Sequence, residues 1–324
     1  MENYKIKLKA TGPITQLPDS QKLFGALVTA YGRIHGSGKT TKLVHAVFDR
    51  KIHLALSNVI PLGYIPLPQD YLVDRLAERI GGERSLKESR ARIKERAYIR
   101  QEDLRSVLEK PATCENLYPY IKKTERQQLR ASIDSVLYGI QGLDTRLYTV
   151  PMVQLLEVER GANGREETRP VSDFCFYLQG EEGESLKEWI ELLERLKESG
   201  ESLILGKRAS QGLNKYEVTG MEKIRLPKSN RYLNLGMLLP DQVDFNASTV
   251  RLFTSQRRPF GMPGGWEQNR SQYFISFIDS GSVIALKDGI RKAGKCVKSP
   301  FYDRDIVFGN GFLYPIWLGK GARG

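Results

Sequence analysis

A strand followed by a helix occurs twice in this chain, and this order constrains the possible folds more than any other feature. Residues 4–8 alternate apolar side chains with lysines, which is the period of a strand that buries one face. A helix follows, beginning near Ser20 and ending at Gly32. The same order returns with a strand over 174–178 and a helix over 184–199. Two such units predict an α+β fold in which helices cover one face of antiparallel sheets.

The two units also predict how the chain divides into domains. Because one unit lies near the start of each half, we expect two ferredoxin-like (RRM-like) modules, residues 1–146 and residues 147–324, with an open sheet face suited to RNA. Within the first module, residues 69–138 are rich in Arg, Glu and Leu at helical spacing and predict a helical insertion. Its mixed charges favour a solvated surface over a nucleic-acid site.

Strand patterns dominate the second half. Residues 147–160 and 165–178 predict two strands joined by a tight turn at Gly161–Gly164, either as a protruding hairpin or as a pair of core strands. Beyond residue 230, short apolar segments separated by glycine and proline predict a β-rich C-terminal half.

Charge and cysteine content narrow the function classes. The chain has 50 Lys plus Arg against 38 Asp plus Glu, a formal charge of +12, which favours a polyanionic partner. Residues 201–324 hold 19 basic and 10 acidic side chains, so most of the excess lies there. Cys114, Cys175 and Cys296 have no CxxC spacing, so we expect neither a metal site nor a disulfide framework. With no signal-peptide pattern and no apolar run of membrane-spanning length, we expect a cytoplasmic protein that has no membrane contact and no cofactor.

The most informative local motif is Gly206–Gly212, a basic stretch bracketed by glycines. The glycines let the backbone approach a ligand closely, Lys207 and Arg208 supply charge, and Ser210, Gln211 and backbone N–H groups supply donors. This composition predicts a phosphate-binding loop. The alternative is a tight hairpin with a solvated tip.

A second glycine-rich stretch, Gly36–Thr41, only partly fits a nucleotide-binding P-loop. Arg33 occupies the position that requires the first glycine, and the stretch follows a helix rather than a strand. We therefore expect a flexible polar loop whose Lys39 contacts a phosphate backbone, with a nucleotide-binding enzyme as the alternative.

All three histidines fall in one window. His35 lies beside the glycine-rich stretch, where it can contact RNA or act as a general base in metal-independent RNA cleavage, although no second catalytic group is evident. His45 and His53 have apolar neighbours and are expected to be packing residues.

The C-terminal half contains a further basic region. Arg251, Arg257, Arg258 and Arg270 surround a glycine-rich segment with Trp266, and such a mixture of cations and a stacking ring suits single-stranded RNA. The alternative is a solvated loop with Trp266 packed inward. Carboxylates in this half form no recognisable metal motif.

Four motifs follow one another in a characteristic order: Leu17–Leu27, Leu205–Gly212, Phe277–Ser282 and Tyr314–Gly319. In order and spacing they resemble the RAMP superfamily, and most closely the subunit that caps the crRNA 5′ end in type III-A (Csm) CRISPR effectors. The resemblance spans both halves of the chain.

The resemblance implies two packed ferredoxin-like folds with the glycine-rich loop close to RNA. It implies a subunit that holds the 5′ handle of the crRNA, contacts the large signature (polymerase-like) subunit on one side and a backbone RAMP subunit on the other, and meets target RNA only through the guide. It also implies a β-hairpin thumb, for which residues 147–178 are the candidate. The family's loop usually closes with Gly-apolar-Gly, whereas Asn214 stands at the last position here. Asparagine tolerates positive φ, so we expect the turn to persist.

We therefore expect a non-catalytic crRNA-binding subunit that acts in antiviral defence. The alternative is a RAMP endoribonuclease that processes repeat RNA with His35 as general base. The residues expected to contact RNA are Gly206, Lys207, Arg208, Ala209, Ser210, Gln211, Gly212, Asn214, Arg33, His35, Lys39, Arg251, Arg257 and Arg258.

Overall fold

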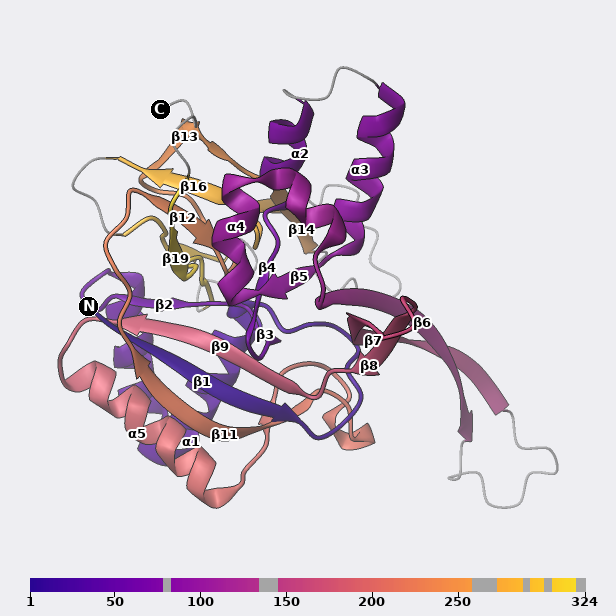
Figure 1. The fold of residues 1–324 in the computed structure, drawn as a ribbon. Coiled ribbons are helices and arrows are strands. Elements are labelled where there is room, and N and C mark those ends of the chain that lie inside the picture. Colours follow the sequence, from indigo (N-terminus) through magenta and orange to yellow (C-terminus); the bar gives the residue numbers. More distant parts are fainter. Residues whose placement is uncertain (78–82, 134–144, 258–272, 288–291, 300–304, 319–324) are drawn as a thin grey trace, which may run out of the picture.

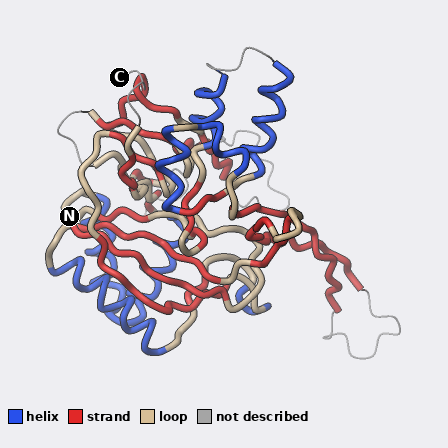
Figure 2. The backbone as a smooth tube through the Cα atoms, viewed as in Figure 1, coloured by secondary structure: helices blue, strands red, loops and turns tan. Residues whose placement is uncertain are grey.

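The computed structural model describes residues 1–77, 83–133, 145–257, 273–287, 292–299 and 305–318. Three sheets of six, five and four strands, two short two-stranded ribbons and a helical lobe make up this part of the chain, and a long hairpin projects from it (Figures 1 and 2). The helices are α1 (Ser20–Phe48), α2 (Gln69–Ala77), α3 (Glu83–Glu95), α4 (Leu104–Glu109) and α5 (Glu184–Ser199).

The largest sheet has six strands, and helices α1 and α5 lie on one of its faces (Figure 1). Its strands, in spatial order, are β10 (Leu203–Ile204), β11 (Lys215–Ile224), β1 (Glu2–Ala10), β9 (Asp173–Gly180) and β2 (Leu54–Leu56), with β3 (Ile60–Pro61) also paired to β9. All of these pairs are antiparallel. Along the chain the order is β1-α1-β2 and then β9-α5-β11.

The two predicted strand-helix units are therefore two halves of one sheet, not the beginnings of two sheets. β1 lies between β9 and β11, so neither half of the chain closes this sheet alone. The predicted boundary after residue 146 falls inside strand β7 (Thr145–Arg160), and the sheets do not divide there. The pattern of each unit was correct, but local periodicity carries no information about which distant strands pair.

The core between this sheet and its helices forms as the periodicity predicts. Phe174, Phe176 and Leu178 alternate on the helix-facing side of β9 and are fully buried against residues such as Leu27 and Trp189. Burial of side chains of this size contributes about 2 kcal/mol each. The expected bounds of α5 are confirmed, and Gly200 ends the helix in the left-handed conformation.

Helix α1 is longer than predicted. It does not end at Gly32 but continues to a kink at Gly36, where φ is 80°, and then on to Phe48. A Cβ on Gly32 would lie 3.3 Å from the Thr40 Oγ1 atom, so the bare glycine leaves room for the segment after the kink. The expected flexible loop at Gly36–Thr41 is therefore wrong. The stretch is kinked helix, and it also lacks the strand-to-helix turn of a P-loop.

The predicted insertion is helical only in part. α2, α3 and α4 lie within it, but β5 (Tyr98–Arg100) and β6 (Tyr120–Ile133) are strands where helix was expected. Residues 125–129 of β6 are exposed on both faces, so no apolar alternation marks them as a strand. Their long polar side chains fit an exposed helix equally well.

The protruding hairpin consists of β6 and β7, which pair from Tyr120–Val158 out to Ile133–Thr145 and project from the body (Figure 1). They belong to a five-stranded sheet that also contains β4 (Tyr64–Pro66), β5 and β8 (Glu166–Pro170). The predicted turn at Gly161–Gly164 does connect two strands, but they are β7 and the short β8. The proposed hairpin over 147–178 is thus wrong in its second arm, because residues 173–180 belong to the largest sheet.

A smaller antiparallel sheet follows residue 230 and confirms the β-rich C-terminal half. Its strands, in spatial order, are β13 (Val243–Thr249), β16 (Val283–Leu286), β12 (Arg231–Asn234) and β19 (Leu313–Ile316), accompanied by the two-stranded ribbons β14 (Leu252–Arg257) with β15 (Tyr273–Ile278) and β17 (Val297–Lys298) with β18 (Ile306–Val307). Strands β11, β1, β9 and β2 of the largest sheet and the four strands of the smaller sheet share one spatial order: counted along the chain within each set of four, it is fourth, first, third, second. In the smaller sheet no described residues between these strands form a helix.

The six-stranded sheet and the four-stranded sheet are joined through β2. The Leu56 amide donates to the Asn310 carbonyl at 3.0 Å, and the Phe312 amide donates to the Leu56 carbonyl at 2.9 Å. Gly236 lies against this junction, where an added Cβ would meet the Leu56 carbonyl oxygen at 2.4 Å. Backbone hydrogen bonds thus fix the two sheets relative to each other.

Candidate nucleic-acid interface

The stretch Gly206–Gly212 is a compact loop between β10 and β11. Ala209–Gln211 form one 3₁₀ turn, flanked by Arg208 and Gly212 with left-handed φ values of 66° and 76°. The Gln211 amide donates to the Arg208 carbonyl at 3.0 Å, so the loop is ordered by its own backbone. A left-handed arginine costs roughly 1 kcal/mol, and such strain is often retained at functional sites.

Asn214 fixes this loop from beneath. It is fully buried, with a φ of 56° that confirms the expected tolerance of positive φ at this position. Its Nδ2 donates to the Lys207 carbonyl at 2.9 Å and to Thr15 Oγ1 at 2.8 Å, and its Oδ1 accepts the Thr15 amide at 2.9 Å. Buried Asn214 is therefore a structural residue under the loop rather than an RNA contact.

Two glycines permit this close packing. An added Cβ on Gly206 would lie 2.7 Å from the Asn214 side-chain amide, and one on Gly12 would lie 2.1 Å from the Gly212 carbonyl oxygen. Both distances are too short for any other residue. The segment containing Gly12 and Thr15 is thus an integral part of the site.

The polar tip of the loop faces solvent. Lys207, Arg208, Ser210 and Gln211 are exposed, while Gly206, Ala209 and Gly212 are half-buried. The structure therefore brings two cations and two neutral polar side chains together on one exposed turn, as the sequence predicts. Electrostatics and backbone N–H groups of this kind suit a phosphate chain.

The β6–β7 hairpin contacts this loop through two side chains. The Arg130 Nη1 atom of β6 donates to Gln211 Oε1 at 2.9 Å, and the Arg208 guanidinium carbon lies 5.0 Å from the ring centre of Tyr148 on β7. Arg130 and Tyr148 were absent from the predicted interface. An arginine and a tyrosine on hairpin arms are weak signals in a sequence, and their pairing appears only once β6 is known to be a strand.

The predicted contacts on α1 lie on a helix, not on a loop. The Arg33 guanidinium pairs with the Glu201 carboxylate at 2.7 Å, and the His35 ring packs against the Tyr31 ring with centres 4.2 Å apart. Lys39 is exposed beyond the kink. Arg33 is thus already neutralised by a carboxylate, whereas Lys39 is an exposed surface cation.

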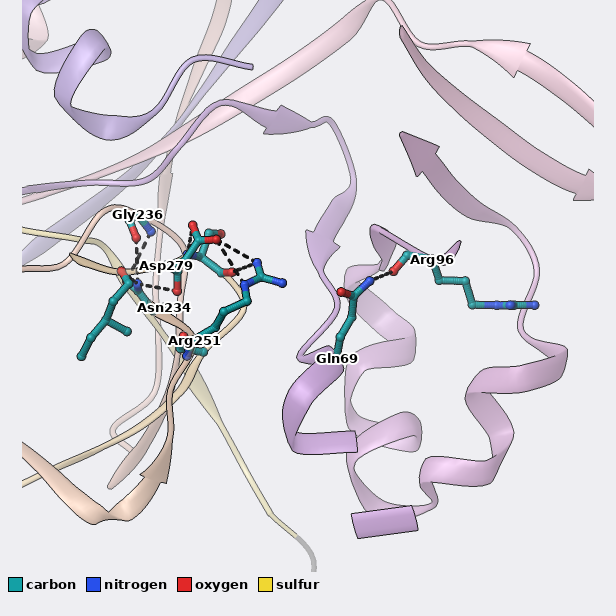
Figure 3. Close-up of polar contacts among 9 residues, drawn as sticks. Gln69, Arg96, Asn234, Gly236, Arg251 and Asp279 are labelled. Atoms are coloured by element: carbon teal, nitrogen blue, oxygen red, sulfur yellow. Dashed lines mark hydrogen bonds and ion pairs between the residues drawn. The ribbon is translucent and has the colours of Figure 1, made fainter. Parts of the chain in front are cut away.

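Arg251 has a structural environment as well. Its guanidinium pairs with the Asp279 carboxylate at 3.0 Å and donates to the Ser280 carbonyl at 2.8 Å (Figure 3). Beside it, buried Asn234 donates to the Ile278 and Asp279 carbonyls (Figure 3).

Other interactions explain Arg251 and its neighbourhood without RNA. The resemblance motif Phe277–Ser282 thus contains a turn that is held together internally. In the helical lobe, Gln69 similarly holds the Arg96 carbonyl at 2.9 Å (Figure 3). The Arg257 side chain, Arg258, Trp266 and Arg270 lie outside the described residues.

The sheet face away from the helices is less open than the RNA-binding face that we expected. Lys5 and Lys9 of β1 lie opposite Glu222 and Glu217 of β11, so their charges are balanced across the strands. On the neighbouring β9, Tyr177 is buried in a second core. This face is therefore partly covered and close to neutral.

His53 is a packing residue, as predicted, but the same prediction is wrong for His45, which is exposed. His53 is 8% exposed, and its Nε2 lies 3.3 Å from Gln179 Oε1. Burial lowers the pKa of His53, so the ring is held in its neutral form.

Comparisons with known proteins place the fold. No family model and no curated protein matches this chain. Solved structures do: a chain in the crystal structure of a Csm1–Csm4 cassette in complex with cA4 aligns with a TM-score of 0.56 and 18% identity, covering 99% of this chain and 100% of that chain. A chain of the Csm3–Csm4 subcomplex of the type III-A CRISPR-Cas interference complex aligns with a TM-score of 0.51 and 13% identity, over 98% and 99% of the two chains. The protein common to both is Csm4.

The chain has a Csm4-like fold. This agrees with the RAMP resemblance of its motifs, and the full-length coverage places both sheets, the helical lobe and the hairpin within the matched architecture. Within the described ranges no helix is long and apolar enough to cross a membrane. Nor do His, Cys, Asp and Glu side chains gather into a metal-binding group in that part of the chain.

Proposed function

We propose that this chain is the non-catalytic crRNA-binding subunit of a type III-A CRISPR effector, and that its loop Gly206–Gly212 holds the 5′ handle of the crRNA. One observation carries the proposal: two exposed cations stand on a strained loop that a buried Asn214 fixes, in a chain with a Csm4-like fold. Lys207 and Arg208 neutralise handle phosphates, while Ser210 and Gln211 donate to sugar or base edges.

The strand orders support a duplicated architecture. We infer that the six-stranded and four-stranded sheets are ferredoxin-like modules, because β11, β1, β9 and β2 of the first and the four strands of the second share the order fourth, first, third, second. The first module is interrupted between β2 and β9 by the helical lobe and the hairpin. The second has short connections in place of helices among its described residues.

Partners follow from the same proposal. The solved structures that match come from complexes of Csm4 with Csm1 and with Csm3, which supports a chain placed between a large subunit and a backbone subunit. In such an arrangement base pairing by the guide reads the target. The handle-binding subunit needs only to grip a fixed single strand and set its register.

The rival proposal, an endoribonuclease with His35 as general base, has little structural support. The His35 ring packs against the ring of Tyr31, whose hydroxyl donates to Glu188 at 2.8 Å. The pKa of Tyr31 is raised to about 12, mainly by burial and to a smaller extent by this hydrogen bond. Tyr31 is therefore no acid or base near neutral pH, and the described part of the chain gives the His35 ring no other side-chain partner that could act as a second catalytic group.

Purification of the chain from its native host tests the proposal. We expect an RNA that begins with repeat-derived sequence to co-purify, together with a large subunit and a backbone subunit. Recovery of the chain without RNA or partner subunits would contradict it. Metal-independent cleavage of repeat RNA by the purified chain, lost in His35→Ala, would instead establish the rival.

A further inference from the structure

The hairpin face above the glycine-rich loop carries an arginine and an aromatic ring side by side. Arg130 of β6 and Tyr148 of β7 are directly opposite in the strand register, so their side chains lie on the same face. Both are half-buried. The Arg130 guanidinium donates to Gln211, and the Tyr148 ring lies under the Arg208 guanidinium.

The base of the hairpin is attached by the backbone, independently of these side chains. The Val153 amide of β7 donates to the Ile14 carbonyl at 2.7 Å, and the Asn214 amide donates to the neighbouring Pro13 carbonyl at 3.0 Å. These bonds set the hairpin over the loop. The outer contacts of Arg130 and Tyr148 are therefore free to be exchanged without detaching it.

Neutral groups hold both cations of this cluster. Arg208 lies on a tyrosine ring, and Arg130 donates to two glutamine oxygens, Gln211 at 2.9 Å and Gln128 at 3.0 Å. Among the ion pairs of the described residues, neither arginine has a carboxylate partner, in contrast to Arg33. Each therefore retains its full charge for an anion.

We infer that Arg130 and Tyr148 complete the RNA site of the loop. In the bound state the guanidinium of Arg208 leaves the Tyr148 ring for a phosphate, and a base of the same strand stacks on the exposed ring face. Arg130 exchanges its glutamine oxygens for a neighbouring phosphate, which its planar donor fork fits well. Stacking on an aromatic ring serves any base, so this part of the site is tolerant of sequence. The inference rests on the proposed function and adds the hairpin to it.

Five single variants of the chain test the inference, with single-stranded RNA of the host's repeat sequence as the probe. Tyr148→Leu is expected to weaken binding about tenfold without changing the salt dependence, since it removes a stacking surface but no charge. Tyr148→Phe keeps the ring and is expected to bind within about twofold of the unmodified protein. Arg130→Gln is expected to reduce the slope of log Kobs against log salt by about 0.7, the value for one single-strand phosphate contact.

Lys123→Gln is the matched control. Lys123 lies on the opposite face of β6, paired with Glu125 at 2.7 Å, and the substitution removes the same charge. It is expected to change neither affinity nor slope. Equal losses in Tyr148→Leu and Tyr148→Phe would overturn the stacking role, and unchanged binding in Tyr148→Leu and Arg130→Gln would overturn the whole inference. A parallel Lys207→Ala variant distinguishes failure of the loop proposal from failure of the hairpin inference. If Lys207→Ala also binds RNA normally, the loop proposal fails. If Lys207→Ala alone binds RNA weakly, only the hairpin inference fails.

Discussion

Replacing Asn214 with alanine is expected to lower the free energy of unfolding by about 3 kcal/mol and to weaken RNA binding about tenfold. The substitution removes three side-chain hydrogen bonds, to the Lys207 carbonyl and to both the amide and the hydroxyl of Thr15. Each contributes about 1 kcal/mol, and the unpaired groups stay buried. Alanine also tolerates the φ of 56° poorly, which adds to the cost. Urea denaturation gives the stability, and amide exchange at Thr15 reports the loop directly.

Asn214→Gly separates the two contributions. Glycine accepts positive φ without strain but makes none of the side-chain bonds, so it should be more stable than Asn214→Ala by about 1 kcal/mol. RNA binding should be weakened in both variants, because both release the Lys207 carbonyl. Full protection of the Thr15 amide in Asn214→Ala would show that the side chain does not hold the loop.

The second large effect is expected at Asn234, where alanine should destabilise the protein by about 4 kcal/mol. Asn234 is fully buried, and its Nδ2 donates to the carbonyls of Gly236, Ile278 and Asp279 at 2.7, 3.0 and 3.1 Å. Its Oδ1 accepts the Gly236 amide at 3.3 Å. Loss of the side chain leaves several backbone groups unpaired away from water, each at a cost of about 1–3 kcal/mol.

Asn230→Ala is the control for this prediction. Asn230 is exposed and lies just before the same strand, so removal of its side chain should change stability by less than about 0.5 kcal/mol. Thermal or urea unfolding of both variants provides the measurement. Equal stability of Asn234→Ala and Asn230→Ala would mean that the amide is not needed to join β12 to the end of β15.

The elements that the sequence predicted well are those that present a regular apolar face to a core. β9 and α5 have strict periodicity because their inward residues meet a core, and both were found at the expected positions. β6 was not predicted as a strand because its outer part is exposed on both faces and has no apolar alternation. The pairing of distant strands could not be predicted from the sequence either, since the residues that pair with β1 lie more than 160 residues further along the chain. Periodicity reports local burial and not topology.

In the candidate site, too, the local features could be predicted from the sequence and the contacts between distant segments could not. The loop at 206–212 was predicted from its glycines and cations, and the positive φ expected at Asn214 is present, but the left-handed φ of Arg208 was not predicted. The roles of Thr15, Arg130 and Tyr148 depend on contacts between segments far apart in the chain. Arg33 and Arg251 looked equivalent to Lys207 in the sequence, but each faces a carboxylate. Formal charge alone cannot distinguish a neutralised arginine from one available to an anion.

The salt dependence of RNA binding shows whether the loop Gly206–Gly212 binds phosphates of the guide. For single-stranded repeat RNA, the double variant Lys207→Ala with Arg208→Ala should reduce the slope of log Kobs against log salt by about 1.4, or two phosphate contacts. Arg50→Ala with Lys51→Ala is the matched control, an adjacent basic pair whose arginine is also left-handed but whose cations face Asp241 and Asp49.

We expect a reduced slope in the loop variant and an unchanged slope in the control. Identical slopes in the loop variant and the unmodified protein would contradict the claim that this loop grips the guide.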